Sequence, residues 1–203
     1  SIKYAKTDEG TSIYADALCA DGSSMVTEFI YWSDYYNSII SPFYSYSTGR
    51  TKETLRSSQV TCRDIDDDGY IEIPEDTSSK KQSSEITSQN WVNYGNTVLS
   101  HKCYSFSCKR DGYILVIDDD DFSKVKANYD SESRKLTIID KKNKSNVFEI
   151  VTLINSNYSV NDPKYKDYTM IMKNSGFVYL AKVNKSSDID INIQTLKDMI
   201  KVY

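Results

Sequence analysis

Residues 12–32 form the first strongly patterned segment, because apolar and polar side chains alternate there on both sides of Asp21-Gly22. Alternation with a period of two indicates strands that turn one face to a core. An Asp-Gly pair between two such runs is a strong signal for a β-hairpin. We therefore predict a hairpin over residues 12–32, then a polar, tyrosine-rich connection and a strand over residues 58–62.

The second half of the sequence carries the same strand signature more densely. The predicted strands lie at residues 91–94, 103–109, 113–117, 124–129, 135–140, 168–173 and 177–183. Asp111-Gly112 predicts a second hairpin, and the longest apolar run, residues 147–154, is typical of a central strand. The chain ends in a predicted helix that Asn192 can cap. The apolar face of this helix should lie on the sheet and consists of Ile193, Leu196, Met199 and Ile200.

Composition supports a sheet protein in two parts. The 17 tyrosines, beside 7 glycines and 3 prolines, favour sheet over helix. From residue 75 to about residue 88 the chain is rich in Ser, Lys, Glu and Asp, which indicates an exposed linker. The predicted fold class is α+β and predominantly antiparallel β, with a β-rich segment over residues 1–76 and an α+β domain over residues 89–203, a sheet packed by the C-terminal helix.

Charge and hydropathy narrow the possible partners. A net charge of −4 and a pI near 5.1 disfavour nucleic-acid binding. No apolar stretch approaches the roughly 20 residues that a membrane-spanning helix needs. The sequence opens without the apolar run of a signal peptide, so we expect any secretion signal or lipid anchor to lie upstream of it.

The four cysteines do not have the spacing of a zinc site. Cys19, Cys62, Cys103 and Cys108 contain no Cys-x-x-Cys pair, and His101 is the single histidine. Disulfides or buried free thiols remain. Cys103 could pair with Cys108 and Cys19 with Cys62, but four cysteines allow three pairings and the sequence does not choose among them.

Candidate chemistry is concentrated between Asp64 and Glu72. Acidic side chains stand at the first, third, fifth and ninth positions of this run, and Gly69 stands at the sixth. A short loop wraps a hard cation in oxygen ligands in this way, and glycine allows its sharp turn. We predict a calcium loop whose ligands are Asp64, Asp66, Asp68, the Tyr70 carbonyl and Glu72. Asp67 should point away and act through its charge.

The residues that follow the loop argue against an EF-hand. Glu75 stands at the twelfth position, but Ile71-Glu72-Ile73 alternates as a strand does, and Pro74 does not suit an outgoing helix. In an extended chain Glu75 lies roughly 10 Å beyond Glu72, too far to share one coordination sphere. The alternative interpretation is a solvated acidic turn. A single loop of this kind binds calcium at roughly 0.1–1 mM.

Residues 14–74 resemble the last blade of a calcium-dependent, integrin-type propeller found in Gram-positive surface lipoproteins. The resemblance is carried by Asp21-Gly22, residues 25–29 and residues 64–74. In that family an α+β domain follows the propeller, and the segment from Trp91 onward is similar to it. The resemblance implies a propeller-blade-like first half, the calcium ligands named above and an extracellular, cell-surface location. A full propeller needs several blades, and this chain has room for about one.

Other candidate sites carry weaker signals. Residues 118–121 are four aspartates after a strand and more readily form a charged turn than a second metal site. No spacing marks a glycosidase carboxylate pair, a catalytic arrangement around His101 or a phosphate loop. The aromatic side chains between Tyr31 and Tyr46 either fill a core and its rim or bind a ligand. If they bind a ligand, the candidate residues are Tyr31, Trp32, Tyr36 and Tyr44.

Taken together, these patterns favour a non-catalytic, extracellular binding or scaffold module with a structural calcium loop and an unidentified surface partner, either a glycan or a protein. The alternative is a carbohydrate- or peptide-binding module that uses the aromatic segment from Tyr31 to Tyr46. A hydrolase with an acidic pair is a third and weaker hypothesis.

Overall fold

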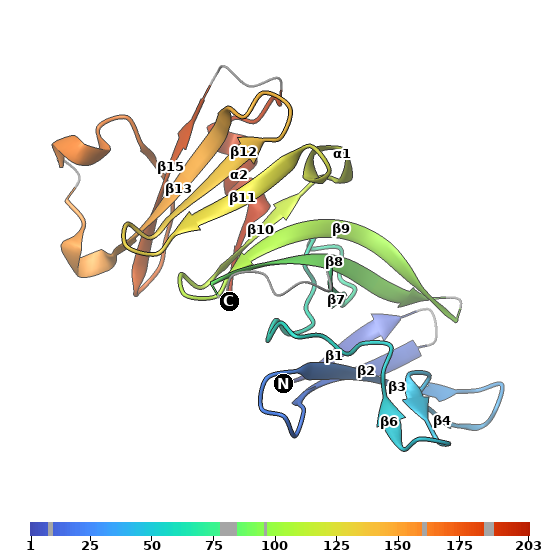
Figure 1. The fold of residues 1–203 in the computed structure, drawn as a ribbon. Helices are drawn as coiled ribbons and strands as arrows, with labels where there is room; N and C mark the ends of the chain where they lie inside the picture. The colour runs from blue at the N-terminus through green and yellow to red at the C-terminus, as the bar shows by residue number, and fades with distance from the viewer. Residues whose placement is uncertain (8–9, 78–84, 96, 160–161, 185–188) are drawn as a thin grey trace. The chain divides into compact units, whose positions relative to one another are not determined.

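The computed structural model describes residues 1–7, 10–77, 85–95, 97–159, 162–184 and 189–203. Strands make up 53% of the chain and helices 9%, so the protein is mostly antiparallel β-sheet. The described residues form four sheets, none of them closed (Figure 1). The chain divides into two compact units. The first unit is Ser1–Gln82 with Thr87–Ser105, and the second unit is Ser83–Ile86 with Phe106–Tyr203.

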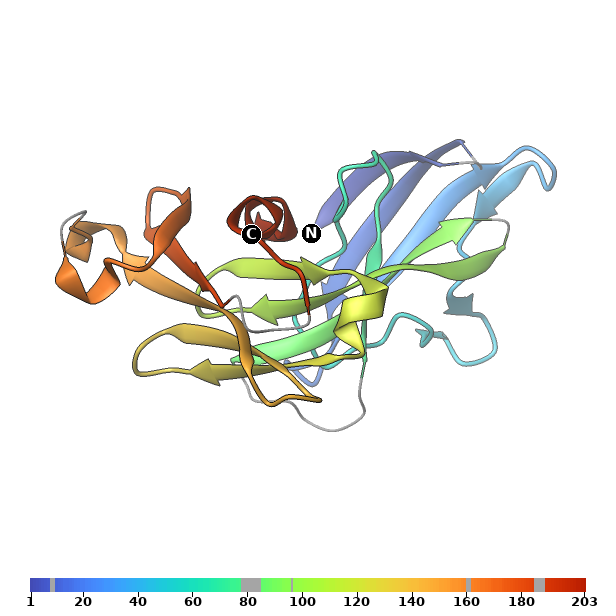
Figure 2. The same ribbon diagram turned by 90° about the horizontal axis from the view of Figure 1, so that it is seen from above.

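The first sheet is an antiparallel meander in the order β1-β2-β3-β4 (Figures 1 and 2). Its strands span Ile2–Thr7, Gly10–Leu18, Met25–Ser33 and Ser38–Ile40. The predicted hairpin over residues 12–32 is confirmed, because β2 and β3 are paired along their length. The turn depends on Gly22, whose φ is +68°, and on Asp21. The Asp21 carboxylate accepts hydrogen bonds of 2.8 Å from the backbone N–H groups of Ser23 and Ser24.

Phe29 lies at the centre of the core of the first unit. It is fully buried, and its ring centroid is 4.8 Å from that of Tyr14 and 4.8 Å from that of Tyr94. The other buried members of this cluster are Phe43, Cys62, Ile73 and Val92. These side chains come from β2, β3, β8 (Ile86–Gly95), the chain just after β4 and the chain around the acidic loop, so the core joins the loop region to the meander. A separate two-stranded sheet pairs β5 (Tyr44–Ser45) with β6 (Arg50–Thr51).

The strand predicted over residues 58–62 is wrong. Two of its backbone groups bond to side chains: the N–H of Cys62 donates to the Asp16 carboxylate, and the carbonyl of Val60 accepts from Arg56. Since each buried backbone group needs one partner, these bonds take the place of a strand ladder. The segment is buried all the same, and Val60 and Cys62 are 4% and 0% exposed.

The predicted linker is wrong at both ends. Glu75 lies in β7 (Ile73–Asp76), which pairs antiparallel with β8 (Ile86–Gly95). In this register Ile73 is opposite Val92 and Asp76 is opposite Gln89. Pro74 is tolerated there because β7 is an edge strand, where a missing N–H breaks no ladder. The middle of the predicted linker, residues 78–84, lies outside the described residues.

The hairpin predicted around Asp111-Gly112 is confirmed. It joins β9 (Val98–Cys108) to β10 (Tyr113–Ile117), and Gly112 has a φ of +71°. These strands belong to a five-stranded sheet in the order β16-β10-β9-β8-β7. The strand β16 (Ile200–Val202), which the sequence analysis did not predict, follows the last helix and pairs antiparallel with β10.

The second unit contains a further five-stranded sheet in the order β11-β12-β13-β15-β14. Its strands span Val125–Asp130, Lys135–Asp140, Asn146–Ile154, Phe177–Val183 and Thr169–Lys173. The strand predicted from the longest apolar run is β13, which occupies the centre of the sheet as expected. Phe148 and Ile150 on β13 are fully buried in the core of this unit.

The helices among the described residues are few and short. The C-terminal helix α2 (Ile193–Met199) begins as predicted, because Asn192 Oδ1 accepts the backbone N–H groups of residues 194 and 195. Leu196 is fully buried, and Ile193 and Met199 pack against the same core, so this part of the predicted apolar face is confirmed. Ile200, the fourth predicted member, is buried as well but begins the strand β16 and does not lie in the helix. Of the four aspartates at positions 118–121, the last three lie in the one-turn helix α1 (Asp119–Phe122), and Asp118 is its N-cap residue. Two 3₁₀ turns span Asn155–Asn157 and Pro163–Tyr165.

The described residues contain no propeller, and their first sheet is a single open meander. The likeness of the first half to one propeller blade stays a prediction. The compact units also differ from the division into residues 1–76 and 89–203, because residues 87–105 belong to the first unit. The hydrogen bonds between β7 and β8 account for this difference, since they tie the two sides of the predicted linker together.

Candidate metal centre

The acidic loop is closed by one pair of residues in the first unit. Arg63 and Glu72 form an isolated antiparallel bridge with N···O distances of 3.0 and 2.8 Å. Between them, Ile65 is fully buried and anchors the loop to the protein interior. Two left-handed residues, Asp67 at φ +62° and Gly69 at φ +90°, let the backbone reverse within a few residues. The loop is therefore held at its base and at one internal point.

Carboxylates organise the backbone of the loop. Asp64 accepts hydrogen bonds from the backbone N–H of Asp68 at 3.1 Å and of Gly69 at 2.9 Å. Asp68 in turn accepts from the N–H of Tyr70 at 2.9 Å. Short acidic side chains favour such turns because they reach their own backbone. These bonds fix where the carboxylates of Asp64 and Asp68 lie.

Three carboxylates converge. Asp64, Asp66 and Glu72 each present an oxygen within 4.8 Å of the other two. Calcium–oxygen distances are about 2.3–2.6 Å, so two ligands of one ion are at most about 5 Å apart, and the spacing fits. Within the part of the chain that the structure describes, no other group of His, Cys, Asp or Glu side chains has this arrangement.

Glu72 is the most informative member of the cluster. Its side chain is fully buried, Oε2 accepts the N–H of Ile65 at 3.0 Å, and Oε1 has no hydrogen-bond partner among the described residues. Leaving a buried carboxylate oxygen unsatisfied is costly. A bound cation would remove that cost, since it would coordinate the free oxygen.

The pKa of Glu72 reflects this environment. Burial raises it to about 7; the bond from Ile65 opposes the rise, and repulsion from Asp66, Asp68 and Asp64 adds to it. The folded metal-free protein therefore holds a proton on Glu72 at pH values where the unfolded chain, with an ordinary pKa near 4.5, has lost it. Because the folded state binds more protons, its stability falls as the pH rises through this interval.

We expect the free energy of unfolding of the metal-free first unit to fall by up to about 3 kcal/mol between pH 4.5 and pH 7.5 through Glu72. Urea titrations in EDTA, followed by tryptophan fluorescence, measure this change, because both tryptophans, Trp32 and Trp91, belong to the first unit. Glu72→Gln should flatten the dependence. An equally steep pH dependence in Glu72→Gln would assign it to other groups.

One predicted ligand, Asp68, is not among the three converging carboxylates, and its ligand role stays a prediction. Asp68 is bound to Lys102, whose Nζ is 2.6 Å from its Oδ2, and the same ammonium is 3.3 Å from Asp66 Oδ2. The ligand role of the Tyr70 carbonyl stays a prediction. Lys102 was missed by the sequence analysis, because it lies 34 residues from Asp68 and no local pattern connects the two.

Three of the four rings proposed for ligand binding are exposed. Trp32, Tyr36 and Tyr44 are 49%, 66% and 39% exposed. Tyr31 instead packs against the core, with its ring centroid 5.4 Å from that of Phe29. The carbohydrate- or peptide-binding alternative stays a prediction and would depend on the exposed three.

The cysteines are all free thiols. Cys62 and Cys108 are fully buried, and burial raises the pKa of each to about 12. A thiol with such a pKa is a poor nucleophile at neutral pH.

His101 Nδ1 forms a hydrogen bond with Asn90 Oδ1, and the centroid of the His101 ring lies 4.5 Å from that of Tyr104.

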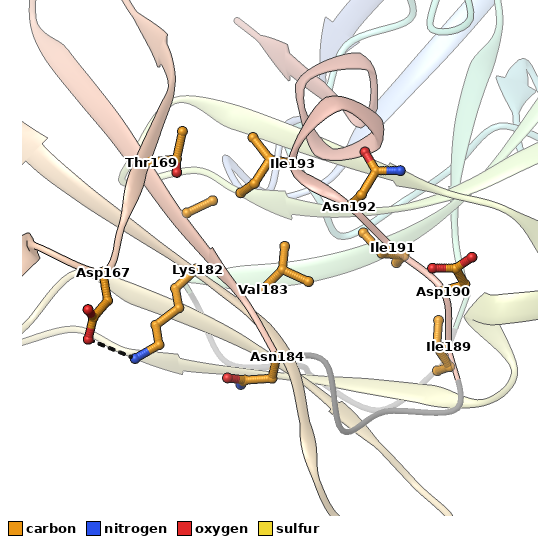
Figure 3. A pocket seen from close by; sticks show the side chains of 11 residues that line it. Asp167, Thr169, Lys182, Val183, Asn184, Ile189, Asp190, Ile191, Asn192 and Ile193 are labelled. Carbon is orange, nitrogen blue, oxygen red and sulfur yellow. Dashed lines mark ion pairs between the residues drawn. The ribbon is translucent and has the colours of Figure 1, made fainter.

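A cavity in the second unit lies between the strands β14 and β15 and the segment that leads into α2 (Figure 3). Its lining mixes Val183 and Ile191 with an ion pair of 3.5 Å between Lys182 and Asp167. It contributes none of the three convergent carboxylates. The acidic loop of the first unit is therefore the better candidate site.

Comparison of this chain with protein-family models, with curated proteins and with solved structures gives no match. Among the described helices, none is long and apolar enough to span a lipid bilayer. The geometry of the acidic loop is therefore the main indication of function.

Proposed function

We propose that this chain is a non-catalytic binding or scaffold module whose acidic loop holds a structural calcium ion. The observation that carries the proposal is the convergence of Asp64 and Asp66 on Glu72, a buried carboxylate with one unpartnered oxygen. Carboxylate oxygens are the ligands that calcium prefers. In this role the ion joins the two sides of the loop across the Arg63–Glu72 bridge and performs no reaction.

The proposed location is extracellular, at a cell surface. The loop supplies three converging carboxylates, and Glu72 must lose a proton before it can bind calcium. These properties suit a weak calcium site, as in extracellular modules, with a dissociation constant of roughly 0.1–1 mM. The resemblance of residues 64–74 to the loops of Gram-positive surface lipoproteins supports the same location. The surface partner in this proposal is a glycan or a protein.

Calcium at about 10 mM is expected to raise the melting temperature of the first unit by about 5 °C or more, since a ligand at 10 to 100 times its dissociation constant adds about 1.4–2.7 kcal/mol. Asp66→Ala should abolish the rise because it removes a converging oxygen. Tryptophan fluorescence melts in calcium and in EDTA measure the difference.

Asp67→Asn is the matched control. It removes one negative charge from the same loop, outside the converging set, and asparagine tolerates the left-handed backbone at this position. The control should keep most of the calcium response. A full response in Asp66→Ala would exclude this loop as the site, and the absence of any response in the unmodified protein would refute the proposed function.

A further inference from the structure

A lysine from a distant strand contacts the acidic loop. Lys102 lies on β9, and its ammonium is 2.6 Å from Asp68 Oδ2 and 3.3 Å from Asp66 Oδ2. The lysine side chain is 27% exposed, and each of the two carboxylates is 33% exposed, so solvent reaches the pair only in part. The loop thus has an internal counter-ion in the absence of metal.

Asp66 is shared between this ion pair and the converging carboxylates. It is one of the three groups whose oxygens lie within 4.8 Å of one another, and it is also a partner of the ammonium. Asp68, the remaining acidic residue of the predicted ligand set, is held by the same ammonium. Lys102 therefore occupies two of the four carboxylates that the loop could offer to a cation.

A divalent ion and this ammonium would repel each other strongly. An ion bound to Asp66 at about 2.4 Å would lie roughly 5–8 Å from Nζ, given the present Lys102 position. Even with the dielectric constant of water, charges of +2 and +1 at that separation change a binding constant by about five- to twentyfold. Loading the loop therefore favours departure of the lysine, which also frees Asp68 to coordinate.

We propose that Lys102 lowers the calcium affinity of the loop by competing with the incoming ion for Asp66 and Asp68. The proposal rests on the calcium site proposed above. In the metal-free state the ammonium holds the loop closed, and in the loaded state calcium replaces it. A divalent ion displaces the ammonium more readily than sodium does, because a singly charged ion brings no greater charge to the carboxylates. The competition thereby raises the calcium concentration at which the loop fills.

Isothermal titration of the full chain with calcium chloride tests this role. Lys102→Met should bind calcium about five- to twentyfold more tightly than the unmodified protein, because the competitor is gone. Lys102→Arg keeps the charge and should remain within about twofold. Lys6→Met is the matched control: Lys6 is exposed on β1 of the same unit, and its loss should change the affinity by less than about twofold. Partly solvated ion pairs of this kind add little stability, so these variants should fold.

The outcomes separate the two proposals. Calcium binding with equal or weaker affinity in Lys102→Met would overturn the role of Lys102 and leave the calcium site in place. No binding by either protein would overturn both. The unmodified protein gives an independent measurement, because the NMR resonance of the Lys102 ammonium should shift on calcium addition while that of Lys6 stays in place. An unchanged Lys102 resonance in a calcium-loaded protein would overturn the exchange of lysine for calcium.

Discussion

Asp16→Ala is expected to lower the free energy of unfolding of the first unit by about 3–5 kcal/mol. Asp16 and Arg56 form an ion pair of 2.9 Å, and both side chains are fully buried. Removing one partner leaves an uncompensated charge in the interior, which is among the most destabilising changes that a single substitution makes. Urea unfolding followed by tryptophan fluorescence measures the loss.

The pair is the centre of a larger hydrogen-bond network. Asp16 also accepts bonds from the hydroxyl of Thr27 at 2.7 Å and from the N–H of Cys62 at 3.2 Å, while Arg56 reaches the carbonyls of Val60 and Thr54. Burial opposes the ionisation of Asp16, but hydrogen bonds led by that from Thr27 outweigh it and lower its pKa. Asp16 is therefore charged at neutral pH, and its loss affects every partner.

Glu53→Ala is the control for Asp16→Ala. Glu53 is exposed in the same unit, and its replacement should change stability by no more than about 0.5 kcal/mol. A comparable, small loss in both variants would mean that water enters the interior around Asp16. Because Asp16 holds Cys62, which precedes the loop, Asp16→Ala should also weaken calcium binding.

Asp111→Ala is expected to destabilise the second unit by a similar amount, about 3–5 kcal/mol. The carboxylate is fully buried, Oδ1 accepts from Arg134 at 2.6 and 2.7 Å, and Oδ2 accepts from the hydroxyl of Tyr129 at 2.8 Å. Arg134, 18% exposed, also stacks over the ring of Phe177 at 4.6 Å. The substitution leaves this arginine without its carboxylate at the base of the β9–β10 turn.

Amide hydrogen exchange measures this effect, because the second unit contains no tryptophan. Protection of the central strand β13 should fall in Asp111→Ala, since its slowest amides exchange through unfolding of the unit. Asp120→Ala, at an exposed position of α1, is the control and should leave the protection unchanged. Unchanged protection in Asp111→Ala would refute the stabilising role of the Asp111 carboxylate.

The elements that the sequence predicted well are those with a long, uninterrupted pattern. The hairpin of β2 and β3 and the central strand β13 have alternating or continuous apolar positions and clear turn residues, so local information is sufficient. The segment 58–62 has the same local character but is not a strand, because Asp16 and Arg56 supply its hydrogen bonds from elsewhere. Tertiary contacts overrode the local preference there.

The candidate site shows the same division between local and distant information. The spacing of Asp64, Asp66 and Glu72 follows from a short loop and could be predicted, and their convergence agrees with it. The pairing of Lys102 with Asp68 depends on where β9 passes the loop, which no spacing rule contains. Of the predicted aromatic group, Tyr31 packs into the core because strand alternation places it on the inner face of the meander beside Phe29.

Ile65 limits how far the acidic run can be treated as a portable motif. This residue stands between two aspartates and is fully buried, and the side chain of Glu72 is fully buried as well. A transplant of residues 64–72 into another scaffold would carry over the negative charges but not the protein interior that buries Ile65 and Glu72. The affinity for a cation therefore depends on the surrounding protein interior as much as on the nine residues of the loop.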